Sequence, residues 1–301
     1  MVNIRVCEGA YFLTSPDTEG IYSDCFGAES EVSDNEKTEY AQQLENIVNE
    51  KIADELIMTV KKIAVQNGGT QAFQEYETGI SFGSAYGCID QARRSRESIV
   101  QKAEKGIRPK EAVNNIPCGA ASKAAILLEL KAFNLTNFDC CNAGVDAVIF
   151  ACETLSEGRA SCAFAVGGDA ELSFAGVLLK LDDDCKDGFF ITGYSKGLVY
   201  GNDVQEQISY LIGSAISSCK VGNFDRIFIV DSNGDTAFDH MKLPKLRNAE
   251  ITELSFDENA ISSKGVFAIG YAKRHMKTGS SALIIQLGRE GHFSCIALNK
   301  T

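Results

Sequence analysis

The order of the apolar segments constrains the fold of this chain more than any other feature of its sequence. Short apolar runs typical of strands alternate with longer segments in which apolar residues recur at helical spacing. Such alternation favours packed layers of sheet and helix, which is an α/β fold. The series starts again near residue 185 without a proline- or serine-rich linker. We therefore predict two halves of similar order, residues 1–185 and 186–301, that fold as one compact body.

The same pattern gives the elements of each half. In the first half, extended segments are predicted at 2–14, 20–33, 79–83, 138–141, 162–166 and 175–181, and helices at 38–66, 89–105, 119–132 and 144–157. In the second half, strands are predicted at 189–195, 226–231, 250–255, 280–287 and 292–298, and helices at 203–219 and 262–276. The last two strands form a hairpin.

The charge and hydropathy of the chain argue against some partners. Asp and Glu outnumber Lys and Arg by 41 to 29, a formal net charge of −12, whereas nucleic-acid binding requires a surplus of basic side chains. No apolar run reaches the roughly 18 to 20 residues that a membrane helix needs. The N-terminus shows no basic leader followed by an apolar stretch, so we expect no signal peptide and a cytoplasmic location.

The 11 cysteines show no pattern of disulfides or metal ligands. None forms a Cys-x-x-Cys pair, and none of the 3 histidines is spaced from a cysteine like a zinc ligand. Most of the cysteines are therefore expected to be small buried side chains in a reducing compartment. We expect neither a metal nor a cofactor.

One cysteine stands at a position that suits a nucleophile. In the stretch 139–144, an apolar segment delivers Cys141 onto the first turn of the predicted helix 144–157. The unpaired N–H groups and the dipole of a helix N-terminus stabilise a thiolate, which is the form of cysteine that attacks electrophiles. The small residues that follow, 142–144, leave room for a thioester. A buried structural cysteine at a strand end is the alternative interpretation.

Several segments together resemble the β-ketoacyl synthases (ketosynthases) of the thiolase superfamily. Residues 79–87 resemble the strand and turn near the start of the catalytic half of these enzymes. Residues 141–144 are similar to the cysteine motif of the family, and residues 166–171 to its Gly-Gly-x-x-Glu strand. Each motif is weak alone, but the set is specific. The resemblance implies an α/β/α/β/α thiolase-like layered fold of two pseudo-equivalent halves, shortened and divergent, in which Cys141 carries an acyl group.

Of the two positions that assist the cysteine in ketosynthases, the first differs in this chain. The resemblance places a first histidine after the strand 226–231, where this chain has Asn233. It places a second residue near Asn259, before the helix 262–276. In the family these residues hold the thioester carbonyl and promote loss of carbon dioxide from a malonyl-type extender. The resemblance therefore implies slow decarboxylative condensation, whereas simple acyl transfer requires fewer catalytic groups.

The closing hairpin resembles the glycine-rich loop that lies beside the cysteine in the family. Gly288 and Gly291 are kept. Arg289 stands where the family has an aromatic residue, and His292 replaces a threonine. We assign Gly288, Arg289 and Gly291 to substrate binding, with backbone N–H groups of this loop and of the cysteine turn as an oxyanion hole. His292 is a candidate base for Cys141; the alternative is a histidine on an edge strand that faces solvent.

Two further features concern protein partners. Residues 91–110 carry seven basic side chains against Glu97 and Glu104, and such a patch suits the acidic helix of an acyl carrier protein. A solvated helix face is the alternative interpretation of this patch. The resemblance also implies a homodimer, or a heterodimer with another ketosynthase, paired through the strand 162–166 at a sheet edge.

The leading hypothesis is a ketosynthase-like acyltransferase or condensing subunit of fatty-acid or polyketide biosynthesis. Cys141 accepts the acyl group from a carrier-protein or coenzyme A thioester, and Asn233, Asn259 and His292 act beside it. The first alternative is a catalytically impaired partner subunit, comparable to the chain-length factors that pair with an active ketosynthase. The missing histidine and the acidic surface favour this alternative, whereas the cysteine argues against it because such partners usually lose that residue. A thiolase-fold binding protein outside lipid or polyketide metabolism is the third.

Overall fold

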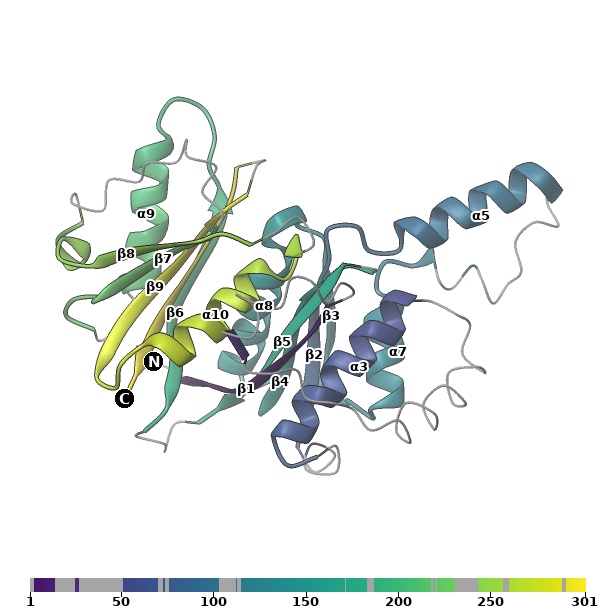
Figure 1. Ribbon diagram of the computed structural model, residues 1–301, viewed down its shortest axis with the longest axis horizontal. Helices are drawn as coiled ribbons and strands as arrows, with labels where there is room; N and C mark the ends of the chain where they lie inside the picture. The colour runs from purple at the N-terminus through teal and green to yellow at the C-terminus, as the bar shows by residue number, and fades with distance from the viewer. Residues whose placement is uncertain are drawn as a thin grey trace.

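One mixed sheet runs through the molecule, with helices on both of its faces (Figure 1). The computed structural model describes residues 3–13, 25–26, 51–69, 73, 76–102, 112, 115–170, 172–182, 187–217, 219, 221–230, 243–256, 260–288 and 291–301. The strands are β1 (Ile4–Leu13), β2 (Thr78–Gly83), β3 (Asn134–Asn137), β4 (Cys162–Gly168), β5 (Ser173–Leu181), β6 (Phe189–Leu198), β7 (Arg226–Val230), β8 (Glu250–Leu254), β9 (Ser280–Leu287) and β10 (His292–Lys300). The α-helices are α3 (Lys51–Gln66), α5 (Ile89–Lys102), α7 (Gly119–Leu127), α8 (Ala143–Ser156), α9 (Val204–Ser217) and α10 (Lys264–His275). Two short 3₁₀ helices are η4 (Cys140–Asn142) and η6 (Pro244–Leu246).

The two halves of the sheet repeat one strand order. The spatial order is β3-β2-β4-β5-β1 in the first half, followed by β6-β10-β9-β7-β8 in the second. Read from the outer edge inward, both halves place their third, second, fourth, fifth and first strands in turn. The halves join where β1 pairs with β6 at Ile4–Ile191 and Arg5–Phe190. This common order agrees with two similar halves, and the boundary near residue 185 stays a prediction because it lies outside the described residues.

The helices form three layers, each with its own apolar core. Helices α8 and α10 lie between the two halves of the sheet, and their apolar residues share the central core with strands of both halves (Figure 1). Helices α3 and α7 pack on the outer face of the first half. Helix α9 packs on the outer face of the second half. The α/β/α/β/α layering predicted from the sequence is therefore confirmed. None of the described helices has the length and apolar character to cross a membrane.

Most predicted elements are confirmed to within a few residues, and the exceptions have physical reasons. The strand predicted at 138–141 is β3 at Asn134–Asn137, and the cysteine segment forms η4 instead. This strand is short, polar and at the edge of the sheet, so it gives no apolar signal. The helix predicted at 119–132 ends at Leu127, as α7. Of the segment 20–33, predicted to be extended, only residues 25–26 are described, and they are helical. The first part of the helix 38–66 lies outside the described residues.

The strand predicted to pair with a second chain is an interior strand. Strand β4 lies between β2, to which it is parallel, and β5, to which it is antiparallel, and it is buried along its length. Both of its edges are occupied, so the expectation that 162–166 forms a subunit contact is wrong. The outer strand of the first half is β3, which pairs with β2 on one side. The connection from β4 to β5 is only four residues, 169–172.

Candidate active site

Helix α8 positions the candidate nucleophile. The helix is buried on almost every side in the central core, as its dense apolar sequence requires. Gly144 in its first turn lets the helix approach the rest of the core closely, because a Cβ atom there would overlap the backbone oxygen of Ser262. A Cβ atom at Gly167 of β4 would also overlap the backbone oxygen of Ser262. These close approaches fix where α8 begins, and hence where Cys141 stands.

The turn before α8 places Cys141 in a half-buried position. Cys140 has a φ of 44°, a left-handed conformation that costs an L-residue roughly 1–2 kcal/mol. Such backbone strain persists only when the surroundings impose it, and it concentrates at functional sites. Here the N–H group of Asn142 donates to the oxygen of Asp139 at 2.9 Å, and Nε2 of Gln286 donates to the oxygen of Cys141 at 2.7 Å. Cys141 is therefore presented at the start of a helix and is not sealed in the core.

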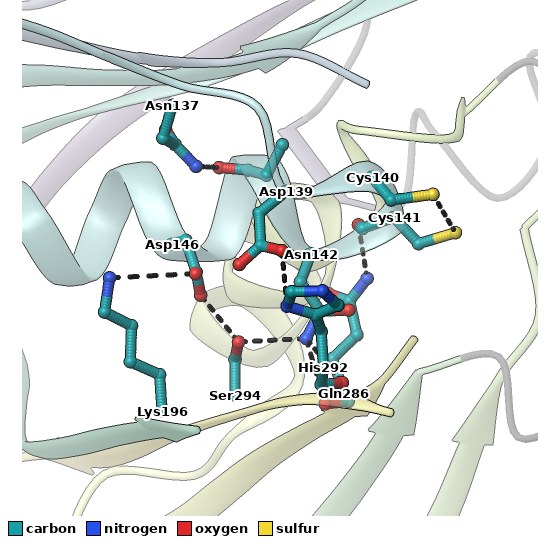
Figure 2. A network of polar contacts seen from close by, with 11 residues as sticks. Asn137, Asp139, Cys140, Cys141, Asn142, Asp146, Lys196, Gln286, His292 and Ser294 are labelled. Carbon is teal, nitrogen blue, oxygen red and sulfur yellow. Dashed lines mark hydrogen bonds and ion pairs between the residues drawn. The ribbon is translucent and has the colours of Figure 1, made fainter. Parts of the chain in front are cut away.

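Asn142 joins the cysteine turn to the closing hairpin. Its side chain is fully buried, and Nδ2 donates to the backbone oxygen of His292 at 3.1 Å and to Oγ of Ser294 at 2.9 Å. The same amide also lies 3.3 Å from the backbone oxygen of Gln286. Figure 2 shows these groups, from η4 and α8 on one side and from β9 and β10 on the other, facing one another. The two halves of the chain thus meet directly beside Cys141.

The imidazole of His292 contacts the aspartate that precedes the two cysteines. Nδ1 of His292 lies 2.5 Å from Oδ1 of Asp139, and the two side chains are 32% and 24% exposed. When Nδ1 carries a proton it donates to this carboxylate, so that Nε2 of a neutral ring is the acceptor. His292 is the first residue of β10, which lies between β6 and β9. The alternative of an edge-strand histidine that faces solvent is therefore wrong.

A buried carboxyl group extends this polar network into the core. Oγ of Ser294 donates to Oδ1 of Asp146 at 2.6 Å, and Nζ of Lys196 lies 3.8 Å from Oδ2. Burial raises the pKa of Asp146 to about 7. A hydrogen bond with Asp139 and the negative charge of that residue add to the rise, Ser294 and Lys196 lower the pKa, and about 7 is the balance of these influences. Asp146 therefore changes its charge near neutral pH, next to the pair of His292 and Asp139 (Figure 2).

Four of the predicted site residues meet in this region. Cys141, Gly288, Gly291 and His292 are described, whereas Asn233, Asn259 and Arg289 lie outside the described residues. The N–H of Gly288 donates to the oxygen of His292 at 2.7 Å, and that of Gly291 to the oxygen of Gly288 at 3.1 Å. A substrate oxygen would have to compete with these two bonds. A Cβ at Gly288 would lie 2.9 Å from Oδ1 of Asn142, so this glycine lets the hairpin approach the cysteine turn.

The sequence did not reveal the groups that support these residues. Asp139, Asp146, Lys196, Gln286 and Ser294 all take part in the network. Only Asp139 had a signal, because it precedes the cysteine pair directly. Asp146 lies within the predicted helix 144–157, and the other three come from positions far along the chain. Across the described residues, no group of three His, Cys, Asp or Glu side chains is placed to hold a metal ion.

The layered α/β fold is thiolase-like, and solved structures of ketosynthases share it. One is described as a type II polyketide synthase acyl-carrier protein in complex with its ketosynthase (AntDE:AntF); it matches with TM-score 0.76 and 14% identity over 100% of this chain and 99% of the other. A β-ketoacyl synthase from Burkholderia phymatum STM815 matches with TM-score 0.71 and 9% identity over 100% of both chains. The ishigamide ketosynthase/chain length factor matches with TM-score 0.66 and 13% identity over 83% of this chain and 81% of the other. At these low sequence identities, the structural similarity shows the fold of this chain and not its activity.

The family match covers the segment that builds the site. Residues 45–179 match the family described as "Beta-ketoacyl synthase, N-terminal domain", and this range contains η4, α8 and β4. This segment is therefore similar in sequence to the β-ketoacyl synthases, and the solved structures show that the whole chain has their fold. No curated protein matches it in sequence.

Proposed function

We propose that this chain accepts an acyl group on Cys141 from a coenzyme A or carrier-protein thioester, in fatty-acid or polyketide-type biosynthesis. The observation that carries the proposal is the position of Cys141. It is half-buried, it follows the left-handed Cys140, and it stands at the start of α8 with its carbonyl held by Gln286. In the reaction the sulfur of Cys141 attacks the thioester carbonyl, and the carrier leaves as its thiol.

His292 is the proposed general base. Its Nδ1 is engaged by Asp139, which fixes the ring and leaves Nε2 to take the proton of the Cys141 thiol and return it to the departing thiol. Asp139 acts as a positioning residue in this scheme, because it touches the imidazole and not the substrate. The contact with Asp139 supports the proposal, since it gives the His292 imidazole a defined orientation beside the cysteine turn.

Acyl transfer is the reaction that these residues favour over condensation. Asn233 stands where the family has a histidine that promotes loss of carbon dioxide, and Asn259 is proposed to hold the acyl carbonyl. The proposed donor is an acyl carrier protein docked on α5, whose Arg93, Arg94 and Arg96 are exposed. Helix α5 projects from the body of the protein, where a partner can reach it (Figure 1).

A partner subunit, similar to a chain-length factor, is the second candidate. The substitution by Asn233 favours it, because a subunit without the histidine depends on another ketosynthase for condensation. Measuring the decarboxylation of a malonyl thioester distinguishes the acyl-accepting enzyme from the partner subunit. We expect the lone chain to accept acyl groups with little decarboxylation. A chain that takes no acyl group, and that decarboxylates only when mixed with a second ketosynthase, is the partner subunit.

Intact-mass measurement tests the proposal directly. The purified chain is mixed with hexanoyl-CoA, and the mass of one hexanoyl group is expected on the wild-type protein. Cys141→Ala is expected to lose this adduct. Cys118→Ala is the matched control, because Cys118 is an exposed cysteine outside the site, and it should keep the adduct. An adduct of equal size on Cys141→Ala would contradict the proposal.

A further inference from the structure

We propose that Cys140 and Cys141 form a redox-sensitive dithiol, which a hydroperoxide converts to a disulfide between neighbouring residues that reversibly blocks acyl transfer. The two Sγ atoms lie 3.8 Å apart, and both side chains are half-buried. Figure 2 shows the two sulfur atoms turned toward each other at the edge of the polar network. The role of the disulfide as a block rests on the proposed function of Cys141, whereas formation of the disulfide does not.

The surroundings of this pair distinguish it from other thiols of the chain. Cys152, Cys162 and Cys295 are buried in the apolar cores, and burial raises the pKa of each of their thiols. Their sulfur atoms are therefore protonated and shielded, which makes them poor nucleophiles. The pair at the start of α8 is only half-buried, so a small oxidant can reach its sulfur atoms.

The chemistry balances with one equivalent of a hydroperoxide. The thiolate of Cys141 attacks the peroxide, so that an S–O bond forms while the O–O bond breaks, and an alkoxide or hydroxide leaves. The thiol of Cys140 then attacks the sulfur of this sulfenic acid. An S–S bond forms, the S–O bond breaks, and water leaves with the thiol proton. Two sulfur atoms are oxidised by two electrons in total, and the peroxide is reduced by two.

The geometry of neighbouring residues makes this disulfide easy to reduce. Cα atoms joined by a trans peptide are about 3.8 Å apart, below the usual 4.4–6.8 Å between bridged cysteines. A disulfide at that spacing is strained, and strained disulfides are the labile ones that thioredoxin-class dithiols reopen. Cys140 already has a left-handed φ of 44°, so the turn departs from regular backbone before any oxidation. A reversible bridge follows from this strain.

Cys140 also protects its neighbour from irreversible damage. A sulfenic acid without a nearby thiol is oxidised further to sulfinic and sulfonic acids, which ordinary reductants do not reverse. A thiol 3.8 Å away captures the sulfenic acid first. The proposal therefore predicts that acyl acceptance recovers after oxidation only when Cys140 is present.

Peptide mass spectrometry isolates this pair from the other cysteines. An endoproteinase that cleaves before aspartate releases residues 139–145, a peptide that contains Cys140 and Cys141 and no other cysteine. The protein is treated with hydrogen peroxide, alkylated with iodoacetamide under denaturing conditions and digested. We expect the peptide to lose two hydrogen atoms and to take no carbamidomethyl group. After dithiothreitol it should take two such groups. An unbridged peptide at peroxide doses that oxidise Cys141 would overturn the proposal.

Recovery of acyl acceptance provides the second measurement. Wild type and Cys140→Ser are oxidised and then reduced, and the hexanoyl adduct is compared with that of each untreated protein. Wild type should recover nearly all of its adduct, whereas Cys140→Ser should recover less than about a tenth because Cys141 passes to sulfinic acid. Equal recovery of the two proteins contradicts the role of Cys140. If the bridge forms but the untreated chain accepts no acyl group, only the proposed function fails.

Discussion

Nδ1 of His292 lies 2.5 Å from Oδ1 of Asp139, and this pair connects the turn before the nucleophile to the hairpin that closes the chain. One residue comes from the segment between β3 and η4, and the other opens β10. The contact gives the imidazole a fixed orientation beside the cysteine turn. The proposed acyl transfer uses this orientation, so its consequences can be measured.

The first prediction concerns the imidazole itself. His292→Asn keeps an N–H group able to donate to Asp139 but removes the base, so we expect the rate of Cys141 acylation to fall about 10²- to 10⁴-fold. The adduct should still form at long times, since the thiol remains. The acylation rates are obtained by quenching the reaction at successive times and measuring the intact mass of the protein. The matched control is His275→Asn at the end of α10, where the ring stacks on Tyr271 at 4.1 Å. A similar loss in both variants would remove His292 from the mechanism.

The second prediction concerns the pH dependence of stability. Burial raises the pKa of Asp146 from 3.8 to about 7, so the folded state holds this proton more tightly than the unfolded chain. Its contribution to the free energy of unfolding is full below about pH 3.8 and is lost as the pH rises through about 7. Asp146→Asn carries no such loss. Relative to wild type, the variant should therefore gain stability as the pH rises from about 3.8 to about 7, by a few kcal/mol at most, since one pKa unit is about 1.4 kcal/mol.

Thermal melts of both proteins across this range measure the difference. Glu157→Gln is a suitable control, because this glutamate is 54% exposed at the end of α8 and its removal should leave the pH profile unchanged. A constant offset between wild type and Asp146→Asn at every pH would show that the carboxyl does not titrate in the folded protein over this range.

The sequence predicted the elements that carry the site better than the contacts between them. Helix α8 and the hairpin of β9 and β10 follow from apolar periodicity, which depends only on neighbouring residues. The strand predicted at 138–141 lies earlier in the sequence, as β3, because Asn134 and Thr136 make this strand polar and give no apolar signal. The interior position of β4 was missed, because the chain order does not fix the order of strands in a sheet. The pair of Asp139 and His292 depends on how the two halves pack, which no local pattern encodes.

The third prediction tests the packing that positions the nucleophile. A Cβ at residue 144 would overlap the carbonyl of Ser262, so Gly144→Ala should destabilise the protein by about 1–3 kcal/mol as an overpacked core. The variant should also acylate more slowly, because α8 must shift. Gly213→Ala is the control in helix α9, where an added Cβ meets no atom within 4 Å and alanine favours the helix. Equal melting temperatures for the two variants would contradict this account of α8.

The fourth prediction tests the surface of α5. Arg94 and Arg96 are exposed on this projecting helix, so the double variant Arg94→Glu, Arg96→Glu should weaken binding of an acidic acyl carrier protein about tenfold or more. The effect should shrink at high salt, because exposed charges are screened. The charge-matched control is the double variant Arg247→Glu, Lys277→Glu, which changes one exposed residue just after η6 and one just after α10. Biosensor titrations measure the affinities, and equal weakening by both changes would assign the effect to net charge alone.

The central claim is that Cys141 receives the acyl group, and the location of that group tests it most directly. After exposure to hexanoyl-CoA, cleavage before aspartate releases residues 139–145 and separates this cysteine pair from every other thiol. Fragmentation of that peptide assigns the group to Cys140 or Cys141. The account predicts a hexanoyl thioester on Cys141 that is absent from Cys141→Ser as a thioester. Acylation spread over other cysteines, or none on this peptide while the protein remains folded, would contradict it.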